Sequence, residues 1–303
     1  MKLTKYYLAA IVAFATWGFF SLVLKPLHNY LSADILFYRV FCCAALMMLI
    51  CMLFRRQSMR DARDAFKTMT PGEKKRTVWL TLSGGVLLTG NWFFFIYAMN
   101  HISVKATSLA YLVCPILTAV LAGVILKEKL NKWQWAAVAL SAFSCMLLSF
   151  NSLLDLFYSI ITAFTYALYL VSQRRNTQLD KFLALSIQIV FSALLLLPFF
   201  PVYSGPVPQE QFFYISILVI AVAFTIVPLF LNLYALKGIN SSTVGMLLYI
   251  NPVIAFSLAV FRYHEEINLL QVLAYALILV SIVVFNGNLL VRTKKPILSP
   301  KNI

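Results

Sequence analysis

Residues Tyr97–Leu140 read YAMNHISVKATSLAYLVCPILTAVLAGVILKEKLNKWQWAAVAL, and residues Tyr234–Leu277 read YALKGINSSTVGMLLYINPVIAFSLAVFRYHEEINLLQVLAYAL. The second segment lies 137 positions after the first, and the two align without a gap. Four pairs of polar or helix-bending residues coincide: Pro115/Pro252, Glu128/Glu265, Asn131/Asn268 and Gln134/Gln271. Such matches are rare by chance in an apolar sequence. A repeat of fixed period predicts two copies of one structural unit.

The composition is that of a protein immersed in lipid. Hydrophobic residues make up 62% of the 303 residues, charged residues 12%, and the mean hydropathy is +0.86, which lies outside the range of soluble globular domains. A helix rises 1.5 Å per residue, so about 20 apolar residues cross a hydrocarbon core. We therefore predict an all-α integral membrane protein with ten transmembrane helices. The predicted spans are Leu8–Leu27, Ile35–Phe54, Val78–Met99, Val104–Leu126, Trp133–Phe150, Leu154–Val171, Phe182–Phe200, Phe212–Leu236, Thr243–Phe261 and Leu269–Val291.

Basic residues gather on one side of this predicted arrangement. With the N-terminus in the cytoplasm, all but four of the 25 Lys and Arg residues fall in cytoplasmic connections, the exceptions being Lys25, Arg39, Lys105 and Arg262. The positive-inside rule therefore predicts that both termini are cytoplasmic. The long connection Arg55–Thr77 is predicted to hold a short surface helix. The net charge of +15 is a topology signal, and no basic aromatic domain is left to bind nucleic acid.

The two copies are separated by five predicted helices, an odd number, so they must cross the membrane in opposite directions. The charges agree with this inversion, because Lys127-Glu128-Lys129 in the first copy becomes His264-Glu265-Glu266 in the second. The predicted domains are a first five-helix repeat at residues 1–151, an inverted second repeat at 152–291 and a basic cytoplasmic tail at 292–303. Inverted halves with a site near the midplane are typical of secondary transporters.

Polar and helix-bending residues inside the spans are the candidates for a solute site. Pro115 and Pro252 each free a carbonyl one turn earlier and bend the helix, and such places often line the cavity of a transporter. Asn91 lies well inside the hydrocarbon, where an unpaired amide is costly. It bonds either a neighbouring helix or a solute, and the same alternatives hold for Asn232 and Asn251.

Arg39 is a basic residue clearly within a predicted span. It follows Asp34 by five residues, roughly 7 Å along a helix, and either snorkels outward, pairs with Asp34 or clamps an anionic group of a solute. Aromatic side chains supply apolar walls with a polar tip. The predicted substrate-binding residues are Arg39, Asn91, Trp92, Tyr111, Tyr249 and Asn251, with Pro115 and Pro252 as bending points.

Several chemistries lack the residues that they need. All ten acidic residues lie at predicted helix ends or in loops, so no carboxylate relay crosses the interior. The five cysteines fall inside the spans at no metal-ligand or disulfide spacing, and the three histidines lie at span ends. No G-x-x-x-x-G-K-[ST] phosphate loop occurs. The sequence therefore predicts no metal site, no cofactor and no ATP-driven pump.

Two blocks of sequence resemble a known family. Gly90-Asn91-Trp92, Phe95-Ile96-Tyr97-Ala98-Met99-Asn100, Ser108-Leu109-Ala110-Tyr111, Pro115 and Lys127-Glu128-Lys129 are similar to the RarD group of EamA-type carriers in the drug/metabolite transporter superfamily. Trp17-Gly18, Tyr38-Arg39-Val40 and Tyr249-Ile250-Asn251-Pro252 fit the same group. The resemblance implies two EamA units, ten helices, a bacterial inner-membrane location and a central cavity. The chain departs from the family at His264-Glu265-Glu266, where relatives commonly have Gly-Glu.

The sequence thus predicts a secondary carrier that exports a small organic metabolite or drug-like solute by alternating access. Solute identity, coupling ion and oligomeric state stay open. A membrane enzyme acting on a lipid or prenyl substrate is the alternative, but it needs acidic or His residues clustered at one membrane face, and here they are dispersed. A third reading, a non-transporting assembly or sensory subunit, gains little support from two inverted halves.

Overall fold

The computed structural model describes residues 4–101, 104–149, 153–264 and 269–292, and this part of the chain consists of helices and short turns, with no β-strand. The α-helices are α1 (Thr4–Gly18), α2 (Ser21–Leu24), α3 (Ser32–Phe54), α4 (Arg56–Thr68), α5 (Pro71–His101), α6 (Val104–Leu126), α7 (Lys132–Ser149), α8 (Leu153–Arg175), α9 (Lys181–Leu196), α10 (Phe200–Tyr203), α11 (Gln211–Ala221), α12 (Val227–Ala235), α13 (Ser241–Leu247), α14 (Ile250–Phe261) and α15 (Leu269–Arg292). The predicted surface helix is α4.

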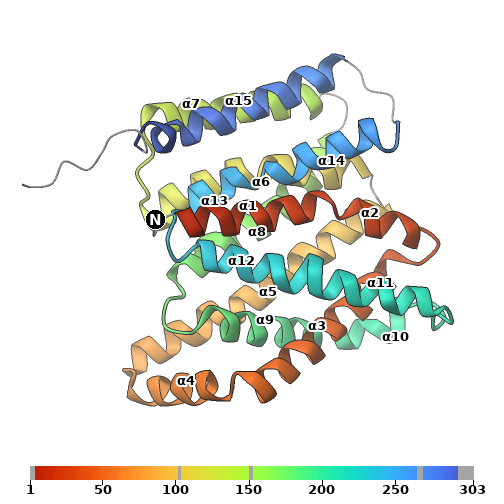
Figure 1. The fold of residues 1–303 in the computed structure, drawn as a ribbon, viewed down its shortest axis with the longest axis vertical. Helices are drawn as coiled ribbons and strands as arrows, with labels where there is room; N and C mark the ends of the chain where they lie inside the picture. Colours follow the sequence, from red (N-terminus) through yellow and green to blue (C-terminus); the bar gives the residue numbers. More distant parts are fainter. Residues whose placement is uncertain (1–3, 102–103, 150–152, 265–268, 293–303) are drawn as a thin grey trace, which may run out of the picture.

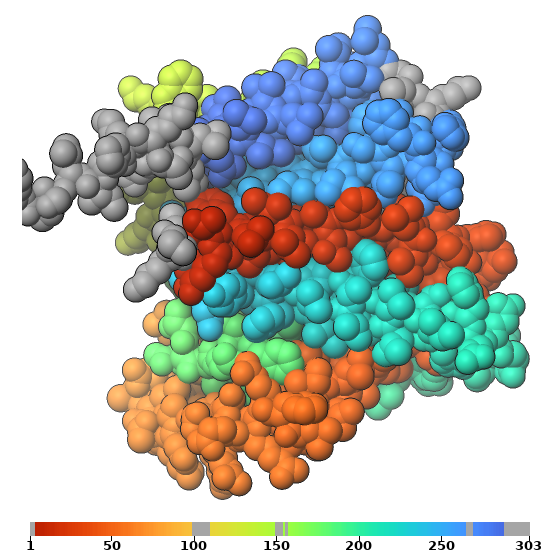
Figure 2. Space-filling view, in the orientation of Figure 1, coloured from red at the N-terminus to blue at the C-terminus, as the bar shows by residue number. Residues whose placement is uncertain are grey.

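The long helices lie side by side, with α7 and α15 at the top of Figure 1 and α3 and α4 at the bottom. The first helix, α1, lies in the middle of the stack and contacts both α12 and α14. The space-filling view shows the same order, with α1 in red between the cyan and blue helices (Figure 2). An N-terminal helix therefore lies between two helices from the other half of the chain.

Seven helical segments of the described residues are long and apolar enough to cross a membrane. They are Thr4–Leu27, Ser32–Phe54, Pro71–Ala98, Lys181–Tyr203, Gln211–Ala235, Ser241–Phe261 and Leu269–Gly287. A chain with these segments is a multi-pass membrane protein. The other three predicted spans fall on α6, α7 and α8, which are helical but are not among the seven. In α6 the apolar stretch is the shorter Ala110–Leu126. The prediction of ten spans therefore stays a prediction.

Several helices begin at residues that satisfy their first backbone N–H groups. At the start of α7, Asn131 Oδ1 accepts from the Gln134 N–H at 2.8 Å, and Gln134 Oε1 accepts from the Asn131 N–H at 3.0 Å. At the start of α9, Asp180 Oδ1 accepts from the Phe182 N–H at 3.1 Å. Reciprocal bonds of this kind satisfy donors that a helix leaves unpaired. The repeated Asn and Gln of the first copy therefore have a structural role as a helix cap.

The repeat is visible in the backbone. Within the described residues the non-glycine residues with positive φ are Lys127, at 56°, and His264, at 52°. They lie 137 positions apart, at the ends of equivalent helices. Positive φ is uncommon for residues other than Gly, so its recurrence at this spacing is a mark of one local structure used twice. Gly at the position of His264 would adopt it more readily.

Helices α7 and α15, which follow these turns, pack against each other. Ser141 Oγ donates to Ser281 Oγ at 2.9 Å, and Ser144 Oγ donates to the Ala274 carbonyl at 2.8 Å. The partner number falls on α15 as the residue number rises on α7, so the two helices are antiparallel. Ser144 and Ser281 are themselves equivalent in the 137-residue repeat.

Candidate functional site

Arg39 lies on α3, and in the part of the chain that the structure describes its charge has no ion-pair partner. Its Nε is buried and has no hydrogen-bond partner in the described residues, and no acidic side chain there forms an ion pair with it. Asp34 forms no ion pair with it and instead accepts at Oδ1 from the Gly205 N–H at 3.0 Å. A buried cation without a partner is costly. The Arg39 guanidinium is therefore available to an anionic group.

An aromatic ring from α5 faces this charge. Arg39 Cζ lies 5.3 Å from the centroid of the Trp92 ring. A cation over an indole face gains about 0.5–2 kcal/mol, which offsets part of the cost of burying it. The hydroxyl of Tyr111, on α6, lies near the same guanidinium. Three of the predicted site residues, from three helices, thus lie together.

Asn91, which precedes Trp92, points to a different neighbour. Its Nδ2 donates to the Thr162 carbonyl at 2.9 Å and to Thr165 Oγ1 at 3.5 Å, both on α8. Consecutive residues of a helix are about 100° apart around its axis, so Asn91 reaches α8 while Trp92 reaches α3. Of the two alternatives from the sequence, the structure contains the interhelical bond.

The α6 helix continues through its proline. Pro115 has no N–H to donate to the Tyr111 carbonyl, yet α6 is a single helix from Val104 to Leu126. The Tyr111 ring packs against Phe95 of α5, with centroids 5.6 Å apart. The wall formed by Tyr111 is therefore held by its neighbour on α5.

The equivalent helix in the second copy is broken. Helix α13 ends at Leu247 and α14 begins at Ile250. Since Pro252 cannot donate to the Leu248 carbonyl, that carbonyl accepts from the Asn251 N–H at 3.0 Å instead. Asn251 itself is buried, with 8% of its surface exposed. Broken helices at membrane depth are tolerated where protein encloses them or where they line a cavity.

Tyr249, in this break, lies in the hydrophobic core. It is fully buried, and its surroundings include Cys114 and Cys145. Its hydroxyl lies near Ser141 but meets no hydrogen-bond geometry among the described residues. The structure thus places Tyr249 between packed helices, apart from the contacts described for Arg39.

A second polar cluster lies at the centre of the helix stack. Trp17 Nε1, on α1, donates to the Phe224 carbonyl at 2.8 Å. Phe224 belongs to a π-helical turn, Val222–Ile226, between α11 and α12. Such turns are rare and occur frequently at functional sites. The Trp17 indole therefore holds a local irregularity in the opposite half of the chain.

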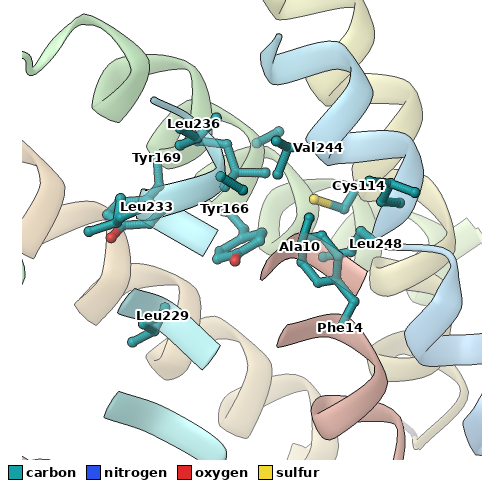
Figure 3. Close-up of a cluster of buried hydrophobic side chains, with 14 of the residues drawn as sticks. Ala10, Phe14, Cys114, Tyr166, Tyr169, Leu229, Leu233, Leu236, Val244 and Leu248 are labelled. Atoms are coloured by element: carbon teal, nitrogen blue, oxygen red, sulfur yellow. The ribbon is translucent and has the colours of Figure 1, made fainter. Parts of the chain in front are cut away.

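The Trp17 ring also meets Tyr166 of α8, at a centroid separation of 5.9 Å. Asn232 Nδ2, on α12, donates to the Tyr166 hydroxyl at 2.6 Å, while Asn232 Oδ1 is buried without a partner in the described residues. Figure 3 shows the Tyr166 ring among side chains of α1, α6, α8, α12 and α13. Polar residues at helical spacing, Thr162, Thr165, Tyr166 and Tyr169, are the signal in α8 that could have identified this position.

At both ends of the helix stack, hydrogen bonds connect residues that are far apart in the sequence. At one end Glu128 accepts hydrogen bonds from Ser241 and Ser242. At the other end the Tyr30 hydroxyl donates to Glu210 at 2.8 Å. Tyr30 lies between the spans, and this bond raises the pKa of its phenol.

Within the described residues no group of three His, Cys, Asp or Glu side chains is placed to hold a metal.

Known proteins resemble this chain along most of its length. It is 27% identical to an uncharacterized transporter YojE of Bacillus subtilis over 277 residues, covering 90% of this chain and 91% of that protein. It is 29% identical to an uncharacterized transporter of Vibrio cholerae over 285 residues, covering 92% and 91%. It is 26% identical to protein RarD of Escherichia coli over 290 residues, covering 92% of each.

A solved crystal structure aligns with the chain at a TM-score of 0.74 and 16% identity, covering 97% of this chain and 99% of that one, which shows a shared fold. The model of the EamA-like transporter family matches twice, over residues 4–150 and 153–287. The resemblance to RarD-like carriers seen in the sequence is thereby confirmed. The chain belongs to the EamA-like transporter family.

Proposed function

We propose that the protein is a secondary transporter that exports a small organic solute bearing an anionic group, by alternating access of two inverted five-helix halves. Membership of a transporter family supports the general function and fits a protein that is not an enzyme. The observation that carries the solute class is the half-buried Arg39, which has a buried Nε and no ion-pair partner in the described residues and lies against Trp92. A carboxylate or phosphate would accept two parallel hydrogen bonds from the guanidinium.

Contacts at the two ends of α3 and α9 support the inversion. Asp34, at the start of α3, accepts from the N–H of Gly205, which lies beyond α9 and the short α10 that follows it. Asp180, before α9, accepts from Arg55 Nη2 at 3.1 Å, which follows α3. Each acid thus binds the segment that follows the other helix. This exchange of partners is what a two-fold axis lying in the membrane plane would produce.

The remaining parts of the proposal come from the sequence. The ten spans, the two cytoplasmic termini and the inner-membrane location follow from the apolar runs, the distribution of basic residues and the bacterial relatives. Asn251 would give hydrogen bonds to the solute, Asn91 would do so with its amide oxygen, and Tyr111 and Tyr249 would complete the walls. Pro115 and Pro252 would be the points at which the repeated helices bend.

Flux through proteoliposomes tests the proposal. Purified protein should accelerate the movement of anionic organic solutes from a metabolite panel. Arg39→Gln should lower that flux at least tenfold, since a factor of ten corresponds to about 1.4 kcal/mol, and Arg39→Lys should restore part of it because Lys keeps the charge but not the fork. Arg63→Gln, on the exposed surface of α4, is the control. Normal flux of anionic solutes by folded Arg39→Gln protein would refute the assignment.

A further inference from the structure

A polar cavity of about 550 Å³ opens at the end of the helix stack that carries most basic residues. It lies between the turn that joins α8 to α9 and the turn that joins α12 to α13. Its lining is Arg174, Thr177, Gln178, Leu179, Asp180, Lys181, Leu236 and Lys237. None of these residues belongs to the solute site proposed above.

Positive charge exceeds negative charge around this cavity. Asp180 is the acid in the lining, and it is shared by Arg55 Nη2 at 3.1 Å and Lys237 Nζ at 4.0 Å. Its Oδ1 also accepts from two backbone N–H groups of α9. Arg174 and Lys181 add two more cations, and both Arg174 and Lys237 repel Lys181. One carboxylate therefore faces four cations, and a further anion would relieve their repulsion.

The cations are held in place by neutral groups. Lys181 is only 4% exposed, and its Nζ donates to the Gln173 carbonyl at 2.9 Å and to the Asn176 carbonyl at 2.6 Å. An ammonium has three donors, so one remains beyond these two bonds. Arg174 Nη1 donates to the Leu236 carbonyl, which leaves other N–H groups of its guanidinium for a ligand. Neither contact neutralises the charge.

We infer that this cavity binds a phosphate group, with an anionic phospholipid headgroup as its occupant. A phosphodiester has several oxygens that can accept from Arg174, Lys181 and Lys237. The cavity lies where apolar helices end, which is the depth of lipid phosphates, and basic pockets between membrane helices on the cytoplasmic side bind such headgroups. Leu179 and Leu236 add apolar surface to the lining, and α9 exposes Ile187, at 37%, to acyl chains less than two turns beyond Lys181.

Lipid retention by the purified full-length protein, measured by native mass spectrometry and by thermal shift, tests this site. Phosphatidylglycerol should bind and raise the melting temperature, whereas zwitterionic phosphatidylethanolamine should not. The double variant Arg174→Gln/Lys237→Gln should lose at least tenfold in phosphatidylglycerol affinity. Lys237→Gln alone, at a side chain that is 41% exposed, should lose severalfold and keeps the inference testable if the double variant does not fold.

The matched control is Arg63→Gln/Lys67→Gln, which removes the same charge from exposed positions of α4. Equal loss of phosphatidylglycerol in the cavity and control variants would overturn the inference, since it would show only attraction to a basic surface. Equal binding of both lipids would overturn it as well. Inorganic phosphate that binds the wild type and competes with the lipid would support the phosphate site and assign it to a free anion. Solute flux plays no part in these outcomes, so they are independent of the proposed transport.

Discussion

Glu128, at the end of α6, caps the start of α13 through Ser242. Glu128 Oε2 accepts from the Ser242 N–H at 3.1 Å and from its hydroxyl at 2.7 Å, while Oε1 accepts from the Ser241 N–H at 2.8 Å. A carboxylate at a helix N-terminus satisfies unpaired donors and interacts favourably with the helix dipole. One residue of the first copy therefore closes this end of the stack against the second copy.

Glu128→Gln should loosen that closure. The amide keeps one acceptor oxygen but loses the charge, so α13 should lose about 1 kcal/mol of local stability. Hydrogen–deuterium exchange of the Ser241–Gly245 amides should then accelerate roughly fivefold. Glu73→Gln is the matched control, because Glu73 accepts from the Thr70 N–H within its own helix start, at 2.9 Å. Unchanged exchange at α13 in the Glu128 variant would contradict the cap.

Trp17→Phe should destabilise the centre of the stack. The substitution keeps an aromatic ring but removes the N–H that bonds the Phe224 carbonyl, and a buried acceptor left unpaired costs about 1–3 kcal/mol. The melting temperature of the detergent-solubilised protein should fall by a few degrees. Trp79→Phe, at a side chain that is 71% exposed, should leave it within error. A similar effect of both substitutions would argue against a special role for Trp17.

Gly245→Ala should strain the crossing of α13 and α6. A Cβ at Gly245 would lie 2.7 Å from Thr118 Cβ and Cγ2, so the helices would have to separate at a cost of about 1–3 kcal/mol. In a double-mutant cycle measured by thermal unfolding, Gly245→Ala should lower the stability less in a Thr118→Gly background than in the wild type. Gly287→Ala, where nothing lies within 4 Å, should be neutral. An equal loss of stability in the two backgrounds would show that contact with Thr118 does not cause the destabilisation.

Reporter fusions should place the turn after Asn100 and the turn at Gly238 on opposite sides of the membrane. These turns are equivalent in the repeat, and an odd number of spans lies between them in the predicted topology. The turn at Gly238, close to Lys237, should face the cytoplasm. If the reporters instead place both turns on the same side of the membrane, the two halves are not inverted and the proposed transport mechanism is wrong.

Part of the candidate site follows from sequence alone. Arg39 stands out because a basic residue inside an apolar run is rare, and Trp92 and Tyr111 belong to a block that resembles RarD-like carriers. The structure brings these three together, but it assigns Asn91 a bond to α8 and buries Tyr249 in the core. Tyr166 was missed, because the polar residues at helical spacing in α8 mark one face of that helix but do not say which helices pack against it.

The sequence by itself determined the membrane class, the repeat and which helix contains each polar residue. Hydropathy, the period of a repeat and helix capping all depend on residues that are close together in the chain or at a fixed spacing in it. The repeated Asn131 and Gln134 cap a helix within one turn of themselves, so their role is local. Only the tertiary structure decided that Glu128 binds Ser242 and that Trp17 bonds the π-helical turn. Those contacts depend on how far each helix is rotated and where it crosses its partner, and packing across the whole chain sets both.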